Sequence, residues 1–360
     1  MLVVFNHAGT FLALPLGPSY LVPSEAIAQM GAIGVDLFFV ISGFVMALSA
    51  RRYVGLSGAG VFLAHRFIRI APLFYLACLV MLAEAIRAGL PLETASVLNS
   101  ITFIPIFDDG TYSWPLHYLG WTLGFEWVFY LLVAVLIASG RGGQHKPLLF
   151  LVMAVPLLGF LSQPELMAGR VLSNPILWEF ALGIIACVLY EKGWLQQLRW
   201  PLVCVAGLTC VLGAVVLLFR PDELLGVGED TMMGGSLAAS RALIWGVPAF
   251  FFFIAVVSLG EVGDGRLGRM LKLLGDASYS IYLSHLFVVM AMLEVVKHMA
   301  WDPDLVVLAT LAVSALVGIR VYRWVEKPML TFGQRSIRQW SLQHMRPMAG
   351  RARQPAPHEG

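Results

Sequence analysis

Charged residues are scarce in this chain. Aspartate, glutamate, lysine and arginine make up 13% of the sequence, about half of their share in soluble domains. The net charge is only +2, and no lysine and arginine cluster is interleaved with aromatic residues, which excludes a nucleic-acid-binding protein. Hydrophobic residues make up 59% of the chain, and its mean hydropathy is +0.79. The composition therefore predicts an integral membrane protein whose main partner is the lipid bilayer.

Cysteine is scarce as well, and the N-terminus lacks a signal peptide. Cys78, Cys187, Cys204 and Cys210 all fall in apolar segments, where we expect small buried hydrophobes rather than disulfides. Their spacing does not suit a metal site, so we predict none. The first residues have no basic region and no small-residue cleavage site. They predict a membrane helix that lacks its first turns, because only fourteen residues precede Pro15, whereas a span needs about 20.

Long apolar runs fill most of the chain, and charged, glycine-rich or proline-rich breaks separate ten of them. They cover residues 2–17, 33–49, 70–88, 117–138, 147–162, 175–190, 201–219, 238–258, 278–296 and 304–322. The fifth and sixth runs are short and contain Pro156 and Pro175, so each is either a span or a re-entrant segment. We find no internal repeat. The pattern predicts an all-α protein, a polytopic membrane helix bundle of about ten transmembrane helices.

The distribution of charge orients these helices. Most of the 24 lysines and arginines fall in alternate loops and in the C-terminal tail, and basic residues gather on the cytoplasmic side of membranes. The opposite loops are acidic, at residues 108–109 and 222–230. We therefore expect both termini in the cytoplasm. Residues 1–330 form the membrane domain, and residues 331–360 form a basic, proline-containing tail that we expect to be disordered or to lie on the anionic inner leaflet.

Three ionisable side chains, His7, Glu126 and His285, fall inside the apolar runs. Charge at that depth costs roughly 2.5–3.5 kcal/mol on insertion scales, so such residues commonly mark an active site or an ion pathway. His7 is either a structural residue bonded to a backbone carbonyl or a general base, because an imidazole titrates near working pH. Glu126 is difficult to explain by packing and predicts a polar cavity.

The most distinctive string is GAIGVDLFFVISGF, residues 31–44. Asp36 lies in the first turn of the expected helix, where a carboxylate favours the positive end of the helix dipole. It is therefore either a helix-start residue or part of a functional site. Ser42 and Gly43 form a small notch that predicts close packing against another helix.

Arg66 and Arg69 lie three residues apart in HRFIRIAP, on one face of the expected helix. They are either anchors at the cytoplasmic face or an anion clamp, because guanidinium groups bind phosphate with two hydrogen bonds. A coenzyme A thioester would suit such a clamp. Near the end of the last span, we expect Glu326 to form a salt bridge with Arg323 or Lys327.

Polar residues follow one stripe in GDASYSIYLSHLFV, residues 275–288. Ser278, Tyr282 and His285 share a helical face, and Tyr279 adjoins Ser278. The stripe either lines a cavity or forms hydrogen bonds between helices.

Aromatic residues flank Glu126, and they are either core packing or cavity wall. The residues that we expect to line the cavity are Asp36, Ser42, Trp121, Tyr130, Ser278, Tyr279, Tyr282 and His285.

In their order along the chain, these strings resemble the acyltransferase-3 family of bacterial membrane acyltransferases, which modify sugars, polysaccharides, lipid-linked intermediates and some antibiotics. The resemblance covers nearly the whole chain, from His7 to Pro328. It rests on GVDLFFVISGF, RFIRIAP, the Trp-x4-Glu-x3-Tyr pattern at Trp121, Glu126 and Tyr130, SYSIYLSH and the closing EKP.

The resemblance implies an acyltransferase of the bacterial cytoplasmic membrane. Its donor would be cytoplasmic acetyl-CoA or another acyl-CoA, and its acceptor a hydroxyl of a sugar, polysaccharide or lipid-linked glycan. His7 matches the family's essential first-helix histidine, and Arg66 and Arg69 match its Arg-x-x-Arg motif. The family usually carries an arginine or lysine eleven positions before that histidine, which here would precede Met1.

These expectations suggest a mechanism and leave a rival. His7 would deprotonate the acceptor hydroxyl, the two arginines would hold the phosphates of the donor, and Glu126 would position the acceptor or His7. Tyr282 or His285 would donate to the developing oxyanion. The rival is a proton-coupled secondary transporter that uses His7, Glu126 and His285 as a proton relay, although such proteins often contain internal repeats.

Overall fold

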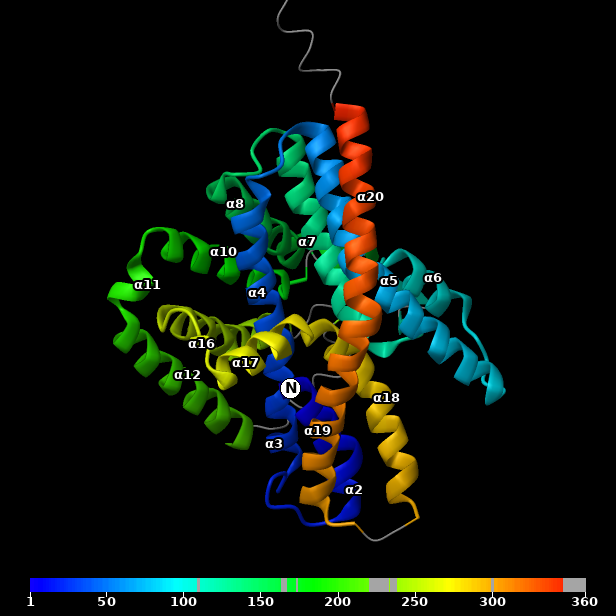
Figure 1. The fold of residues 1–360 in the computed structure, drawn as a ribbon. Helices are drawn as coiled ribbons and strands as arrows, with labels where there is room; N and C mark the ends of the chain where they lie inside the picture. The colour runs from blue at the N-terminus through cyan, green and yellow to red at the C-terminus, as the bar shows by residue number, and fades with distance from the viewer. Residues whose placement is uncertain are drawn as a thin grey trace, which may run out of the picture.

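The protein is a bundle of helices with one small hairpin (Figure 1). The computed structural model describes residues 1–108, 111–162, 167–172, 174–219, 233, 238–298 and 301–345. Seven of the described helices are long and apolar enough to cross a membrane. The prediction of an all-α polytopic membrane bundle is therefore confirmed.

The first part of the chain forms a short interrupted helix followed by two long helices. Its elements are α1 (Leu2–Ala8), the π-helix η1 (Gly9–Ala13), α2 (Leu14–Leu16), α3 (Glu25–Gln29), the 3₁₀-helix η2 (Met30–Ala32), α4 (Ile33–Ala50) and α5 (Gly55–Arg87). The π-helix begins two residues after His7. Insertions of this kind are frequent at functional sites.

Among its described residues, the middle of the chain contains the hairpin, seven α-helices and one 3₁₀-helix, and of these α10 and α7 pack against α4. The elements are α6 (Thr94–Thr102), β1 (Ile106–Asp108), β2 (Thr111–Ser113), the 3₁₀-helix η3 (Tyr118–Gly120), α7 (Trp121–Ala138), α8 (His145–Ser162), α9 (Met167–Leu172), α10 (Leu177–Glu191), α11 (Trp194–Gln197) and α12 (Arg199–Phe219). The antiparallel hairpin is held to α6, because Asn99 Nδ2 donates to the Tyr112 hydroxyl at 3.1 Å. Burial raises the pKa of Tyr112 to about 12, so the phenol stays protonated.

The last part of the chain ends in a very long helix. The elements are α15 (Ala238–Arg241), the π-helix η4 (Ala242–Gly246), α16 (Val247–Ser258), α17 (Arg266–Asp276), α18 (Ser278–Val296), α19 (Pro303–Val321), the π-helix η5 (Tyr322–Glu326) and α20 (Lys327–Met345). Residues 331–345 are helical, because α20 continues α19 and η5 without a break, so the expected disorder is not found in these residues. Contact of the tail with the inner leaflet stays a prediction. Residues 346–360 lie outside the described residues.

Each of the ten apolar runs falls on a described helix, but not all of these helices have the length of a span. The helices at Leu2–Leu16 and His145–Gly159 are shorter, and α10 has 15 residues. In contrast, α5 is longer than the predicted run 70–88, because it begins at Gly55. The charged residues before residue 70 lower the hydropathy of that segment but do not end the helix. The count of ten and the orientation of the termini stay predictions, and the acidic loop at 222–230 lies outside the described residues.

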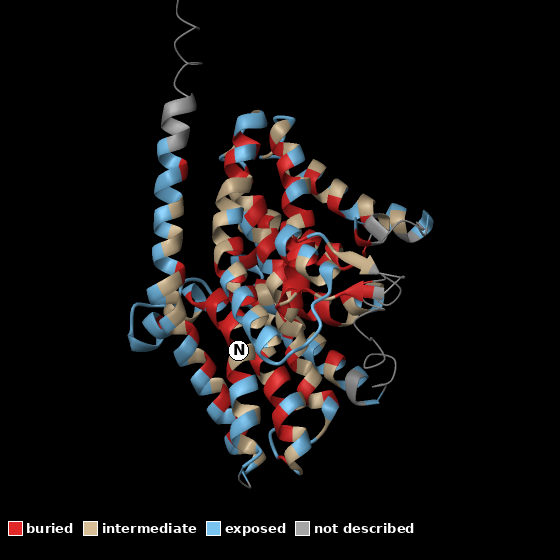
Figure 2. Ribbon diagram, turned by 90° about the vertical axis from the view of Figure 1, so that its right-hand side faces the viewer, coloured by how far each residue is buried: buried red, intermediate tan, exposed pale blue. Residues whose placement is uncertain are grey.

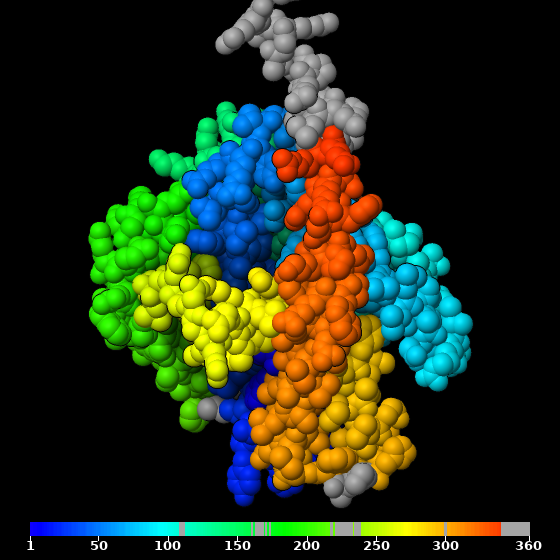
Figure 3. All heavy atoms as spheres, in the orientation of Figure 1, coloured from blue at the N-terminus to red at the C-terminus, as the bar shows by residue number. Residues whose placement is uncertain are grey.

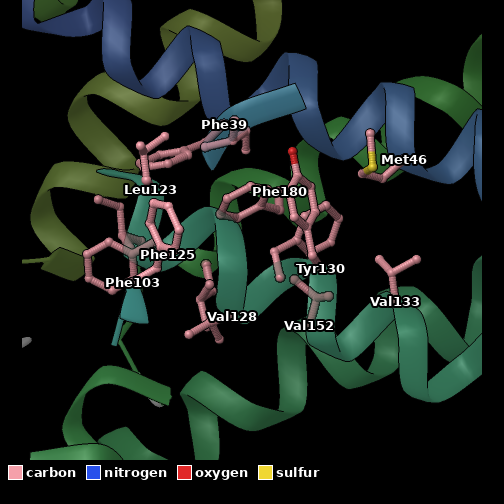
Figure 4. Close-up of a cluster of buried hydrophobic side chains, with 14 of the residues drawn as sticks. Phe39, Met46, Phe103, Leu123, Phe125, Val128, Tyr130, Val133, Val152 and Phe180 are labelled. Carbon is pink, nitrogen blue, oxygen red and sulfur yellow. The ribbon is translucent and has the colours of Figure 1, made fainter. Parts of the chain in front are cut away.

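Helices α4 and α10 form the centre of the bundle. A Cβ atom on Gly43 would clash with the carbonyl oxygen of Phe180, and one on Gly183 would clash with that of Val40, so the two helices touch through their backbones. The close packing predicted from the Ser-Gly notch is confirmed. Aromatic residues such as Phe39, Phe125 and Phe180 fill the space beside it (Figure 4). The rings of Phe129 and Phe180 are stacked, with their centroids 4.3 Å apart. Figure 2 shows that buried residues gather where the helices meet, whereas α20 is largely exposed.

Candidate active site

A cavity of about 540 Å³ lies between α1, α4, α5, α7, α17 and α18. Most of the residues predicted to form a site meet there. The polar and aromatic side chains that line it include Ser42, Arg66, Arg69, Thr122, Glu126, Tyr130, Ser278, Tyr279, Tyr282 and His285. The polar stripe on α18 therefore faces a cavity. The remaining wall is mainly aliphatic, from α1, α4 and α17.

His7 lies directly behind this cavity, in contact with His285. His7 Nδ1 is 2.9 Å from His285 Nε2, and the two rings stack with their centroids 5.1 Å apart. His285 belongs to the cavity wall, whereas His7 does not. His7 retains 8% exposure, and His285 has none. The two histidines, which lie 278 positions apart in the sequence, thus form a pair at one end of the cavity.

The hydrogen bonds around the pair determine which nitrogen carries each proton. His285 Nδ1 lies 2.6 Å from the carbonyl oxygen of Tyr282, and a carbonyl only accepts, so this nitrogen must be the donor. In the neutral ring, His285 Nε2 is then an acceptor, and His7 Nδ1–H donates to it. His7 Nε2 then carries a lone pair with no hydrogen-bond partner among the described residues, as a general base requires.

Glu126 is buried in the wall of the cavity, with 2% exposure. Its Oε1 accepts a hydrogen bond from the Ser42 hydroxyl at 2.5 Å. Its Oε2 has no hydrogen-bond partner among the residues that the structure describes. A buried polar atom without a partner is costly, and Glu126 is among the residues that line the cavity.

The two predicted clamp residues differ in their surroundings. Arg69 pairs with Glu326, and its guanidinium lies over the ring of Tyr279. Glu326 also accepts from the Ser280 hydroxyl at 2.5 Å. The expected salt bridge of Glu326 with Arg323 or Lys327 is therefore wrong. Arg66 has no ion-pair partner among the described residues, and its Nε is buried without a hydrogen bond. Of the two arginines, Arg66 is therefore the one whose charge is not neutralised by an acid among the described residues.

Two residues that were expected to line the cavity lie elsewhere. Trp121 packs in the hydrophobic core against Phe125, with ring centroids 6.3 Å apart. Asp36 is fully buried behind the cavity and pairs with Arg241, whose Nη2 lies 2.8 Å from Asp36 Oδ2. The placement of Asp36 and Trp121 in the cavity wall is wrong. Opposite charge explains the position of Asp36, since a carboxylate that is removed from water needs a counter-ion.

Sequence reasoning missed two members of this second cluster and one further histidine. Glu179 on α10 is fully buried near Asp36 and Arg241, and we name these three residues the closed cluster. The side chain of Arg241 is 11% exposed and faces the fully buried Asp36. His117 is also fully buried, and its Nε2 lies 3.1 Å from the carbonyl oxygen of Leu283 on α18. The sequence did contain a signal for the closed cluster, because two acids and one arginine fall inside runs that are otherwise apolar.

A third polar group lies where α4, α8 and α10 approach one another. His145, Cys187 and Glu191 bring possible metal-ligand atoms within 4.8 Å of one another. Glu191 is already engaged, since Arg51 Nη1 lies 3.0 Å from one of its oxygens and His145 Nε2 lies 2.8 Å from the other. Ion pairing therefore explains this group.

Comparisons with known proteins agree with the geometry. Residues 1–323 match the sequence model of a family described as an acyltransferase domain. The chain is 32% identical over 310 residues to the exopolysaccharide production protein ExoZ of Rhizobium meliloti (strain 1021), which covers 85% of this chain and 91% of that protein. No solved structure matches the chain. The family match includes every residue that lines the cavity.

Proposed function

Because the chain belongs to the acyltransferase-3 family of membrane acyltransferases, we propose that it moves an acetyl or other acyl group from acyl-CoA to a glycan hydroxyl. The observation that carries this proposal is the His7–His285 pair at one end of a cavity that also contains two arginines. The similar protein is named for exopolysaccharide production, so the proposed acceptor is a polysaccharide or its lipid-linked precursor. The proposed location is the bacterial cytoplasmic membrane.

The pair is suited to base catalysis of acyl transfer. His7 Nε2 would remove the proton of the acceptor hydroxyl as its oxygen attacks the thioester carbonyl. The C–S bond would then break, and the protonated imidazole would return the proton to the leaving thiolate. His285 is a positioning residue in this scheme, since it fixes the tautomer of His7 through the 2.9 Å contact. General base catalysis of this kind typically accelerates a reaction by about 10²–10⁴-fold.

The cavity supplies the remaining roles. Arg66, with Arg69 behind it, would bind the phosphates of a donor that enters from the cytoplasmic side. Glu126 Oε2, which lacks a partner among the described residues, would accept a hydrogen bond from a substrate hydroxyl. The Tyr282 hydroxyl lies in the same wall and donates to the carbonyl oxygen of Leu119 at 3.1 Å. It would turn from this carbonyl to donate to a developing oxyanion.

Labelled donor added to membrane vesicles tests the proposal. Inside-out vesicles from cells that make the protein, together with matched vesicles from cells that lack it, would receive acetyl-CoA labelled in the acetyl group. We expect label in a glycan fraction only where the protein is present, with free coenzyme A formed in equal amount. Accumulation of a solute in the vesicles without acylation would instead favour the transporter and contradict the proposal.

A further inference from the structure

Helix α17 is amphipathic, and its apolar side is uncovered. Leu267, Met270 and Leu271 are 65%, 51% and 44% exposed, and with Leu274 they follow the spacing of a single helical face. The helix has 11 residues, far fewer than the roughly 20 that a membrane span needs. Figure 3 shows it in yellow on the surface of the molecule, beside α19 and α20. In Figure 1 it runs across the direction of these two helices.

The other side of α17 is basic. Arg266, Arg269 and Lys272 lie along it, and all three are exposed. Lys272 Nζ lies 2.7 Å from Asp264 Oδ1, and Arg269 donates to the Asp264 carbonyl oxygen at 2.6 Å. Arg266 has no ion-pair partner in the part of the chain that the structure describes. Because basic residues gather on the cytoplasmic side of membranes, these three residues also predict that α17 lies on that side.

We propose that α17 is an interfacial helix that binds the anionic phospholipids of the cytoplasmic leaflet. Its leucines and methionine would enter the boundary between headgroups and acyl chains, while its basic residues would contact phosphate groups. Three arguments favour lipid over a protein partner. The helix is too short to cross the bilayer, it is attached directly to a spanning helix, and its charge is opposite to that of the inner leaflet.

The position of α17 connects this contact to the cavity. Leu274 and Gly275 line the cavity, and α18 begins at Ser278, which also lines it. The helix therefore forms one side of the cavity at the level of the headgroups. If the proposed function holds, contact with the leaflet surface shapes the entrance that the acyl donor uses. The contact of α17 with lipid does not itself depend on that function.

Site-directed fluorescence on the full chain tests the proposal. In a Cys204→Ala, Cys210→Ala background, which removes the two exposed cysteines, Leu271→Cys would carry an environment-sensitive label. Asp276→Cys, on the opposite side of the same helix, is the matched control. The protein would be reconstituted in phosphatidylcholine vesicles with or without phosphatidylglycerol, and quenched with spin-labelled lipid or aqueous iodide.

We expect the label at position 271 to be quenched by spin-labelled lipid and protected from iodide, with the reverse at position 276. Phosphatidylglycerol should increase the lipid quenching, and Arg266→Gln should reduce that increase about fivefold, the factor equivalent to one basic residue at an anionic surface. A label at 271 that iodide reaches and lipid does not would overturn the proposal. Protection from both quenchers would also overturn it, because a protein surface would then cover α17. Equal quenching with and without phosphatidylglycerol would contradict the role of anionic lipid.

Discussion

Two groups of ionisable residues lie inside the bundle, and they differ in what surrounds them. The cavity cluster consists of Arg66, Arg69, Glu126 and His285, with His7 behind it, and it faces an open space of about 540 Å³. The closed cluster consists of Asp36, Glu179 and Arg241, none of which lines that space. Both clusters place ionisable side chains inside an otherwise apolar helix bundle. Only the first lines a space that a ligand could occupy.

The difference teaches that charge within a membrane domain has two separate explanations. In the closed cluster, a guanidinium faces two carboxyl groups, and its Nη2 lies 2.8 Å from Asp36 Oδ2. Such a group stabilises a fold mainly because removing one partner is costly. Both clusters contain polar atoms without a hydrogen-bond partner among the described residues, but Arg66 in the cavity cluster also lacks an ion-pair partner there and lines the cavity. Substitutions in the two clusters should therefore change different observables.

His7→Ala should produce the largest effect, a loss of about 10²–10⁴-fold in the initial rate of acyl transfer, because it removes the proposed base. The amount of protein in the membrane and its melting temperature should stay unchanged. Labelled acetyl-CoA in vesicles measures the rate, and immunoblotting measures the amount. His298→Ala, at an exposed histidine near the end of α18, is the matched control and should retain full activity. Normal activity of His7→Ala would remove His7 from the mechanism.

Arg241→Met should act on stability instead of chemistry. It leaves Asp36 and Glu179 buried without a counter-ion, which typically costs about 3–5 kcal/mol. We expect a lower melting temperature in detergent and less protein in the membrane. Arg87→Met is the control, since the Arg87–Glu84 pair lies at the surface with side chains 76% and 47% exposed. A stable Arg241→Met protein without activity would show that the closed cluster belongs to the reaction, and would end the distinction between the clusters.

Local patterns in the sequence predicted one of these clusters better than the other. Residues three or four positions apart share a helical face, so the stripe at Ser278, Tyr282 and His285 could be predicted to line a common space. The Ser42–Gly43 notch likewise indicated a close helix contact, because small residues permit it.

Long-range pairing was beyond that reasoning. Arg69 and Glu326 are 257 positions apart, and Arg241 and Asp36 are 205 apart. For each acid, the local sequence suggested a different explanation. Asp36 could be explained as a helix-start residue, and Glu326 by the basic residues adjacent to it. Helical periodicity states which face a residue occupies and not which other helix covers that face. The helix after residue 330 was missed for a related reason, since a polar composition does not prevent α20 from extending a helix that is already formed.

Arg66→Gln should produce a smaller and more selective change than either substitution above. A hydrogen bond to a charged group is worth about 1.5–3 kcal/mol, so the KM for the acyl donor should rise roughly 10–100-fold. The kcat and the melting temperature should change little, because Arg66 has no ion-pair partner among the described residues. Steady-state rates over a range of acetyl-CoA concentrations separate the two constants. Arg66→Lys, which keeps the charge but not the planar fork, should lie between the variant and the parent. An unchanged KM with a reduced kcat would contradict the clamp.

Ser42→Ala should produce the smallest effect. It removes the 2.5 Å hydrogen bond from Ser42 Oγ to Glu126 Oε1, and a loss of about 1 kcal/mol in positioning corresponds to about a fivefold fall in kcat. Ser49→Ala on the same helix is the control, because the hydroxyl of Ser49 makes only a 3.4 Å contact with a backbone carbonyl. If Ser42→Ala lowers the melting temperature and leaves kcat unchanged, Glu126 is a structural residue. The cavity cluster would then contain an acid with a structural role, as the closed cluster does, and the contrast between them would rest on His7 and the arginines alone.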